Sequence, residues 1–220
     1  MGFSLSEYDK LTYENASFGN IACIYFHERK DFERFIQIIR YRCEPIEIPQ
    51  SVGAMYIKGI INWRKIEEHC ENYRDSIIVL SRGLYSNTPM DQYGLPANKL
   101  EEISYFIRRY HEFTHFICRH CFGKIEGNLL WEKIVADGVG IISSIGTYIP
   151  ELASEFLGII NVDGKLEYKS GSRLEVYMNG RSISTSDLNM VKKYIDMVSE
   201  FFKNYPWKEK ELEVLIKAPF

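Results

Sequence analysis

The stretch NKLEEISYFIRRYHEFTHFICRHC, residues 98–121, decides the fold of this chain. Its apolar side chains recur every three or four residues, which is the spacing of one face of an α-helix. Asn98 and Glu101 have the spacing of a helix cap and the third helical residue, and Gly123 is a typical stop. We therefore predict a long helix over about residues 99–121. Its apolar face carries Leu100, Ile103, Ile107, Tyr110, Phe113 and Ile117.

A second helix is predicted directly after the first, over about residues 129–145. The run LLWEKIVADGVGII, residues 129–142, is apolar enough to be largely buried in the folded protein. Only the short segment KIEGN, residues 124–128, connects the two helices. We therefore expect the helices to pack against each other in antiparallel fashion.

Shorter segments on either side of the two helices predict strands and further helices, which together give an α+β fold with a small mixed β-sheet. We find no internal repeat and no linker rich in Pro or Gly, so a single domain over residues 1–220 is the simplest interpretation. Its parts are an N-terminal α/β region over about residues 1–97, the two helices over about 98–145, and a hairpin with a terminal helix over about 160–205. The predicted strands are residues 20–26, 54–60 and 76–81, the predicted helices are 31–42, 63–75 and 187–205, and the predicted hairpin is 165–178.

Composition excludes several classes of function. The 27 basic and 30 acidic side chains are well mixed and give a net charge of -3, which offers no electrostatic surface for nucleic acid. No apolar run approaches the roughly 20 residues that cross a bilayer, and the N-terminus does not resemble a signal peptide. Five cysteines without regular spacing favour a reducing compartment, so we expect a cytoplasmic protein that does not bind membranes.

The sequence His111-Glu112-Phe113-Thr114-His115 is the motif that carries chemistry. Residues four apart on a helix lie on the same face, so both imidazoles can reach one ion. Neutral imidazole is a good zinc ligand, and a catalytic zinc normally has three protein ligands and one open position. Glu112 stands next to the first histidine and could take a proton from a water molecule that the metal activates.

This motif resembles the HExxH signature of the zincin metallopeptidases, and the resemblance covers little beyond residues 111–115. HEFTH followed by WEKIVADGVGI is also similar to uncharacterised bacterial zincin-like proteins. The resemblance implies a zincin-like fold, in which the long active-site helix packs on the second helix. It also implies a zinc-dependent hydrolase that cleaves a peptide or amide bond, with His111 and His115 as metal ligands and Glu112 as the general base.

The third metal ligand remains open between Asp137 and Glu132. In gluzincins the ligand is a glutamate within an E-x-x-A-D arrangement on a later helix. Ala136-Asp137 matches its end, but position 133 is lysine, and the nearest glutamate is one residue earlier. Asp137 is favoured because it is the only charge in the apolar run IVADGVGII, and a buried carboxylate needs a metal or an oppositely charged partner. In a third interpretation Asp137 accepts a hydrogen bond from a ligand histidine instead of binding the metal.

Other residues near the motif suggest further, weaker hypotheses. Cys118 and Cys121, with His115 and His120, could form a structural zinc site, although no second CxxC pair accompanies them. The metzincin extension is absent, because these cysteines stand where its glycine and third histidine belong. Structural zinc sites usually draw pairs of ligands from separate elements, whereas Cys118 and Cys121 share one helical turn.

A peptidase must also stabilise an oxyanion and hold an extended substrate. Arg173 and Tyr177, expected on one face of the second hairpin strand, are candidate oxyanion donors, and His120 is a third. The strand at residues 76–81 could pair with a peptide if its edge is free.

The leading hypothesis is a zinc-dependent metallohydrolase that acts on a peptide or protein substrate. A rival hypothesis is a zincin-like binding or regulatory module that retains zinc without turnover, and a second rival is a structural protein without metal. The sequence does not indicate an oligomeric state.

Overall fold

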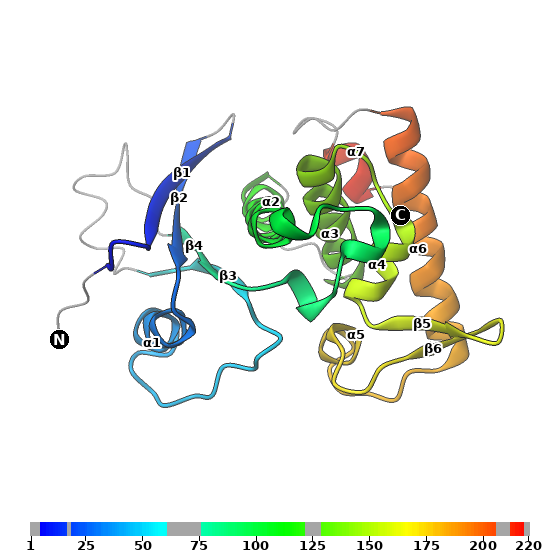
Figure 1. Ribbon diagram of the computed structural model, residues 1–220, viewed down its shortest axis with the longest axis horizontal. Helices are drawn as coiled ribbons and strands as arrows, with labels where there is room; N and C mark the ends of the chain where they lie inside the picture. The colour runs from blue at the N-terminus through cyan, green and yellow to red at the C-terminus, as the bar shows by residue number, and fades with distance from the viewer. Residues whose placement is uncertain (1–4, 17–18, 61–75, 122–128, 206–211, 218–220) are drawn as a thin grey trace. The chain divides into compact units, whose positions relative to one another are not determined.

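Two compact units, residues 1–83 and 84–220, make up the computed structural model, where the sequence analysis expects one domain. The structure describes residues 5–16, 19–60, 76–121, 129–205 and 212–217. The helix predicted over residues 63–75 lies outside this part of the chain. Both units mix helices with strands, so the α+β prediction is confirmed (Figure 1).

The first unit is a four-stranded mixed sheet with one helix. Its strands are β1 (Lys10–Ala16), β2 (Gly19–Phe26), β3 (Ala54–Lys58) and β4 (Ser76–Ser81), in the order β1-β2-β4-β3, and its helix is α1 (Arg29–Ile39). β2 and β4 pair in parallel, whereas the other two pairs are antiparallel. The predicted strands and the first predicted helix are confirmed. β1 was not predicted, because its half-exposed run KLTYENA contains too few apolar residues.

The apolar side chains of α1 form the core of the first unit against the sheet. Phe32 and Ile36 of α1 are fully buried and pack with Phe26 of β2, Ile57 of β3 and Val79 of β4. The strand at residues 76–81 lies between two partners, β2 and β3, so it has no free edge with which a peptide could pair. A strand that is so fully buried and continuously apolar is typical of the interior of a sheet.

The second unit is built on two long helices, α2 (Leu100–Cys121) and α3 (Leu129–Ile145), whose bounds match the prediction. Ile107 faces Gly140, His111 contacts Asp137, and His115 contacts Glu132. Because these partners follow one another in opposite order along the two helices, the packing is antiparallel, as predicted.

Shorter elements complete the second unit around α2 and α3 (Figure 1). The predicted terminal helix is confirmed as α6 (Thr185–Asn204), which begins at a Ser184 cap with reciprocal hydrogen bonds to Asp187. The helices α4 (Pro150–Phe156) and α7 (Leu212–Lys217) were not predicted. No helix in the described part of the chain has the length and apolar composition needed to cross a membrane. The remaining elements are β5 (Ile159–Val162), β6 (Lys165–Tyr168) and α5 (Arg173–Tyr177).

The predicted hairpin at residues 165–178 is wrong. β6 instead pairs with β5, and the two-residue turn between them is Asp163-Gly164, with both residues at positive φ. Asp-Gly is a strong signal for this kind of turn, stronger than the Ser-Gly-Ser on which the prediction rested. The run RLEVY therefore forms the helix α5 and not a strand.

Gly140 allows the close approach of α2 and α3. A Cβ atom at this position would lie 2.8 Å from the backbone oxygen of Ile107, which no rotamer change can move. We expect Gly140→Ala to lower the free energy of unfolding by about 1–2 kcal/mol, because overpacking outweighs the gain of about 1 kcal/mol in helix propensity. Urea unfolding measures the change.

Ser144→Ala is the matched control for this prediction. Ser144 lies on the same helix, and its hydroxyl has no hydrogen-bond partner among the described residues, so alanine there should leave stability nearly unchanged. A Gly140→Ala variant as stable as the wild type would contradict the close approach of the helices.

Candidate metal centre

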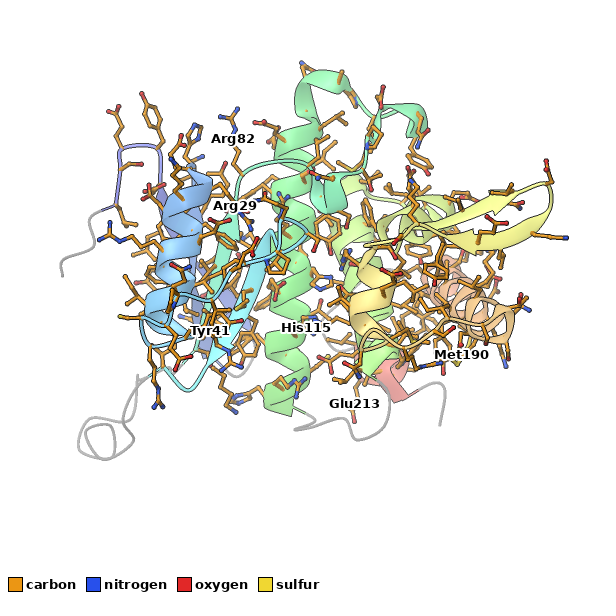
Figure 2. The ribbon with its side chains drawn as sticks, turned by 90° about the horizontal axis from the view of Figure 1, so that it is seen from below. Arg29, Tyr41, Arg82, His115, Met190 and Glu213 are labelled. Carbon is orange, nitrogen blue, oxygen red and sulfur yellow. The ribbon has the colours of Figure 1, made fainter. Side chains whose placement is uncertain are left out.

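α2 brings the two histidines of the HEFTH motif to the interior of the second unit. His111 and His115 are 3% and 5% exposed, and their ring centroids lie 4.8 Å apart in an edge-on arrangement. Figure 2 labels His115 on α2. The helical spacing of the motif places both rings on the same face of α2, as the sequence predicts, and in the structure this face is buried.

Each imidazole is held by a carboxylate from α3. Asp137 Oδ1 lies 2.8 Å from His111 Nδ1, and Glu132 Oε1 lies 2.6 Å from His115 Nδ1. Both carboxylates are 1% exposed. The two acidic residues considered for the third metal ligand thus contact the histidines on their Nδ1 side, each on a different ring. For Asp137 this is the third interpretation above, in which the carboxylate orients a histidine.

Both imidazoles are neutral at neutral pH. Burial lowers the pKa of His111 from 6.5 to about 4, although Asp137 opposes this effect. Burial and then the charge of Lys133 lower the pKa of His115 to about 4, whereas the hydrogen bond that His115 donates to Glu132 acts in the opposite direction. A neutral imidazole carries a single N–H, and only this form can bind a metal ion.

The carboxylates decide which ring nitrogen carries that hydrogen. Burial raises the pKa of Asp137, but Arg173 and His111 lower it by more, so this carboxyl group is ionised. Burial also raises the pKa of Glu132, but the hydrogen bond with His115 and the charges of His115, Arg119 and Lys133 together lower it by more. An ionised carboxylate only accepts hydrogen bonds, so the Nδ1 atoms donate and both Nε2 atoms keep a lone pair.

The two Nε2 atoms face each other at a distance of 3.1 Å. Because neither carries a hydrogen, they cannot bond to each other, and both keep a lone pair that a cation could use. Two nitrogens, each roughly 2.0–2.1 Å from a tetrahedral zinc ion, lie about 3.3 Å apart. The histidine pair therefore fits a zinc ion in chemistry and in spacing.

A lysine from α3 contacts one of these two nitrogens. Lys133 Nζ lies 2.9 Å from His115 Nε2 and 5.6 Å from the centroid of the Tyr177 ring. Burial lowers the pKa of Lys133, and the charge of Glu112 acts in the opposite direction. Glu112 is itself buried, at 8% exposure. Among the residues that the structure describes, no group of three or more His, Cys, Asp or Glu side chains is arranged to hold a metal.

Asp137 is the centre of a second layer of polar contacts behind His111. Its Oδ1 atom accepts hydrogen bonds from the Tyr85 hydroxyl and, at 3.0 Å, from Arg173. Arg173 also donates to Tyr177 and, at 2.9 Å, to Ser86. Burial raises the pKa of Tyr85 well above 10, so its hydroxyl stays protonated and donates. The network fixes the position of the carboxylate that holds His111.

The three candidate oxyanion donors lie on two different helices. Arg173 and Tyr177 lie one turn apart on the helix α5, not on a strand, and Arg173 is brought to Asp137. His120 is exposed near the end of α2, with its ring beside Phe116.

Cys118 is fully buried, and the side chain of Cys121 lies outside the described residues. The described atoms thus give no support to a structural zinc site at the end of α2.

Sequence reasoning missed Tyr85 and the role of Lys133. Tyr85 belongs to the turn-rich stretch after β4, and no periodicity marks it as buried. Lys133 was noted only as a departure from the glutamate of the E-x-x-A-D arrangement. A signal did exist, because residues 133 and 137 are four apart and share the helix face that meets α2.

These features define an α+β protein with a buried pair of histidines, each oriented by a carboxylate. The chain belongs to a family of unknown function, DUF7005, whose family model matches residues 1–72 and 68–216. No curated protein and no solved structure matches the chain.

Proposed function

We propose that this protein is a zincin-like, zinc-dependent hydrolase that cleaves a peptide or amide bond, with the metal held by His111 and His115. One observation carries the proposal: two neutral imidazoles place their Nε2 atoms 3.1 Å apart, while carboxylates hold both Nδ1 atoms. Carboxylates in these positions are typical of metal-binding histidines, because they orient the ring and make Nε2 a stronger ligand.

The residues of this chain divide the work of such a site. His111 and His115 hold the cation, and Asp137 and Glu132 orient them. A bound zinc ion supplies Lewis acidity, which polarises a carbonyl group and makes water easier to deprotonate near neutral pH. Glu112 is buried and follows His111 directly in the sequence. In this proposal it accepts the proton of the attacking water and returns it to the leaving amine.

A non-catalytic metal-binding module is the second candidate. Both acidic residues of α3 are engaged at the Nδ1 atoms, and the amine of Lys133 lies against His115 Nε2. A catalytic zinc normally has three protein ligands, so a site with two histidines alone would favour binding or regulation over turnover.

Zinc titration of the metal-free protein tests the metal site. We expect one equivalent of zinc to bind to the wild type, and His111→Ala and His115→Ala each to weaken this binding by at least about tenfold, because each removes one of the imidazole ligands. Isothermal titration calorimetry gives the stoichiometry and the dissociation constant. The control is His120→Ala, which removes an exposed histidine from the same helix. A wild type that takes up no zinc, or histidine variants that bind as well as the wild type, would rule out the proposed site.

A further inference from the structure

Lys133 stands where a metal ion would meet His115. An ammonium group has three hydrogen-bond donors and no acceptor, so its contact with His115 Nε2, at 2.9 Å, uses the lone pair of that nitrogen. A ring nitrogen has a single lone pair in the plane of the ring. His115 Nε2 can therefore bind the lysine or a cation, but not both at once.

Several contacts hold the amine in this place. Lys133 lies over the Tyr177 ring, at a distance where a cation and an aromatic face attract each other. Burial works against the charged form of Lys133, and the negative charge of Glu112 attracts the amine. Lys133 lies on α3, whereas its partners Tyr177 and His115 lie on α5 and α2. The contact is thus built from three elements of the second unit.

We propose that Lys133 determines the cation affinity of this site, because its ammonium group occupies the lone pair of His115 Nε2 and must leave before a divalent cation binds. This inference rests on the proposed metal site of His111 and His115. It identifies an internal competitor for the metal, supplied by the same helix that supplies both orienting carboxylates.

Removal of the amine is expected to strengthen zinc binding. Lys133→Met keeps the aliphatic stem and removes the charge and the donors, so zinc no longer displaces a charged hydrogen bond. In the wild type, zinc binding must break the charged hydrogen bond between Lys133 and His115. Because the variant lacks this bond, we expect its dissociation constant for zinc to be lower by at least about tenfold. Lys133→Gln keeps a neutral donor and should fall between the wild type and Lys133→Met.

The experiment is calorimetric titration of the metal-free full chain with zinc chloride. Lys193→Met is the matched control, because Lys193 is exposed on α6 and the substitution makes the same change of charge. The expected order of affinity is Lys133→Met, then Lys133→Gln, then the wild type together with Lys193→Met. Lys133 variants that bind zinc no more tightly than the wild type overturn the inference.

A second measurement uses the wild type alone and does not depend on the folding of a variant. Acetic anhydride modifies free amines, and mass spectrometry reports the modified fraction at each lysine. We expect modification of Lys133 to rise when zinc saturates the protein, with Lys193 as the internal reference. Unchanged or reduced modification of Lys133 at saturating zinc overturns the inference.

The two proposals fail in different ways. If His115→Ala binds zinc as well as the wild type, the proposed metal site itself is wrong. If His115→Ala loses zinc while Lys133→Met matches the wild type, the metal site stands and only the role of Lys133 is wrong.

Discussion

Glu112→Gln is expected to lower hydrolytic turnover by at least about a hundredfold while leaving zinc affinity near that of the wild type. The carboxamide has almost the same size as the carboxylate, but it cannot accept a proton from water. The two imidazoles that hold the metal are unchanged. Hydrolysis of a mixture of fluorogenic peptides gives the turnover, and calorimetry gives the affinity.

Glu102→Gln is the control for this prediction, because Glu102 is exposed in the first turn of the same helix. It should retain both turnover and zinc binding. A Glu112→Gln variant with wild-type turnover would exclude Glu112 as the general base. A wild type that binds zinc at the histidines but cleaves none of the peptides would favour the non-catalytic module.

Asp137→Ala is expected to lower the free energy of unfolding by about 3–5 kcal/mol. Asp137 is 1% exposed and accepts hydrogen bonds from Tyr85, His111 and Arg173. Its removal leaves the cation of Arg173, whose side chain is 11% exposed, without its carboxylate partner, and burial makes an uncompensated charge costly. Urea unfolding of the metal-free protein measures the loss.

Asp196→Ala is the matched control for the loss of an ion pair. Asp196 pairs with Lys192 on the surface of α6, where such pairs contribute about 0.3–0.5 kcal/mol. The double variant Asp137→Ala with Arg173→Met should recover part of the lost stability, because it also removes the stranded charge. The buried network would have no role in stability if Asp137→Ala cost no more than Asp196→Ala.

The HEFTH motif and its helix were predictable because their signals are local. Apolar residues at helical spacing set the bounds of α2 and α3, and histidines four apart necessarily share a helix face. The same reasoning failed for RLEVY, whose five residues are compatible with a strand and a helix. There the choice depends on β6, which pairs with β5 and leaves the later residues free to form α5.

Local sequence patterns could not decide whether Asp137 or Glu132 is the third metal ligand. Residues 132 and 137 lie about 140° apart around a helix, so they cannot both face one metal ion without distortion. In the structure they face different rings, Glu132 at His115 and Asp137 at His111. The geometry of α3 alone shows that residues 132 and 137 cannot both bind one metal ion. Which histidine each of them contacts depends on how α3 packs against α2.

The sequence by itself determined the two long helices, the α+β class, and the placement of His111, Glu112 and His115 on one helix, because each of these depends on residues within a few turns. The tertiary structure alone decided that carboxylates hold the Nδ1 atoms, that Tyr85 and Arg173 support Asp137, and that Lys133 reaches His115 Nε2. These contacts join residues that lie 17 to 52 positions apart in the sequence. Gly140 lets α2 and α3 approach closely, and the periodicity of the sequence does not encode this approach.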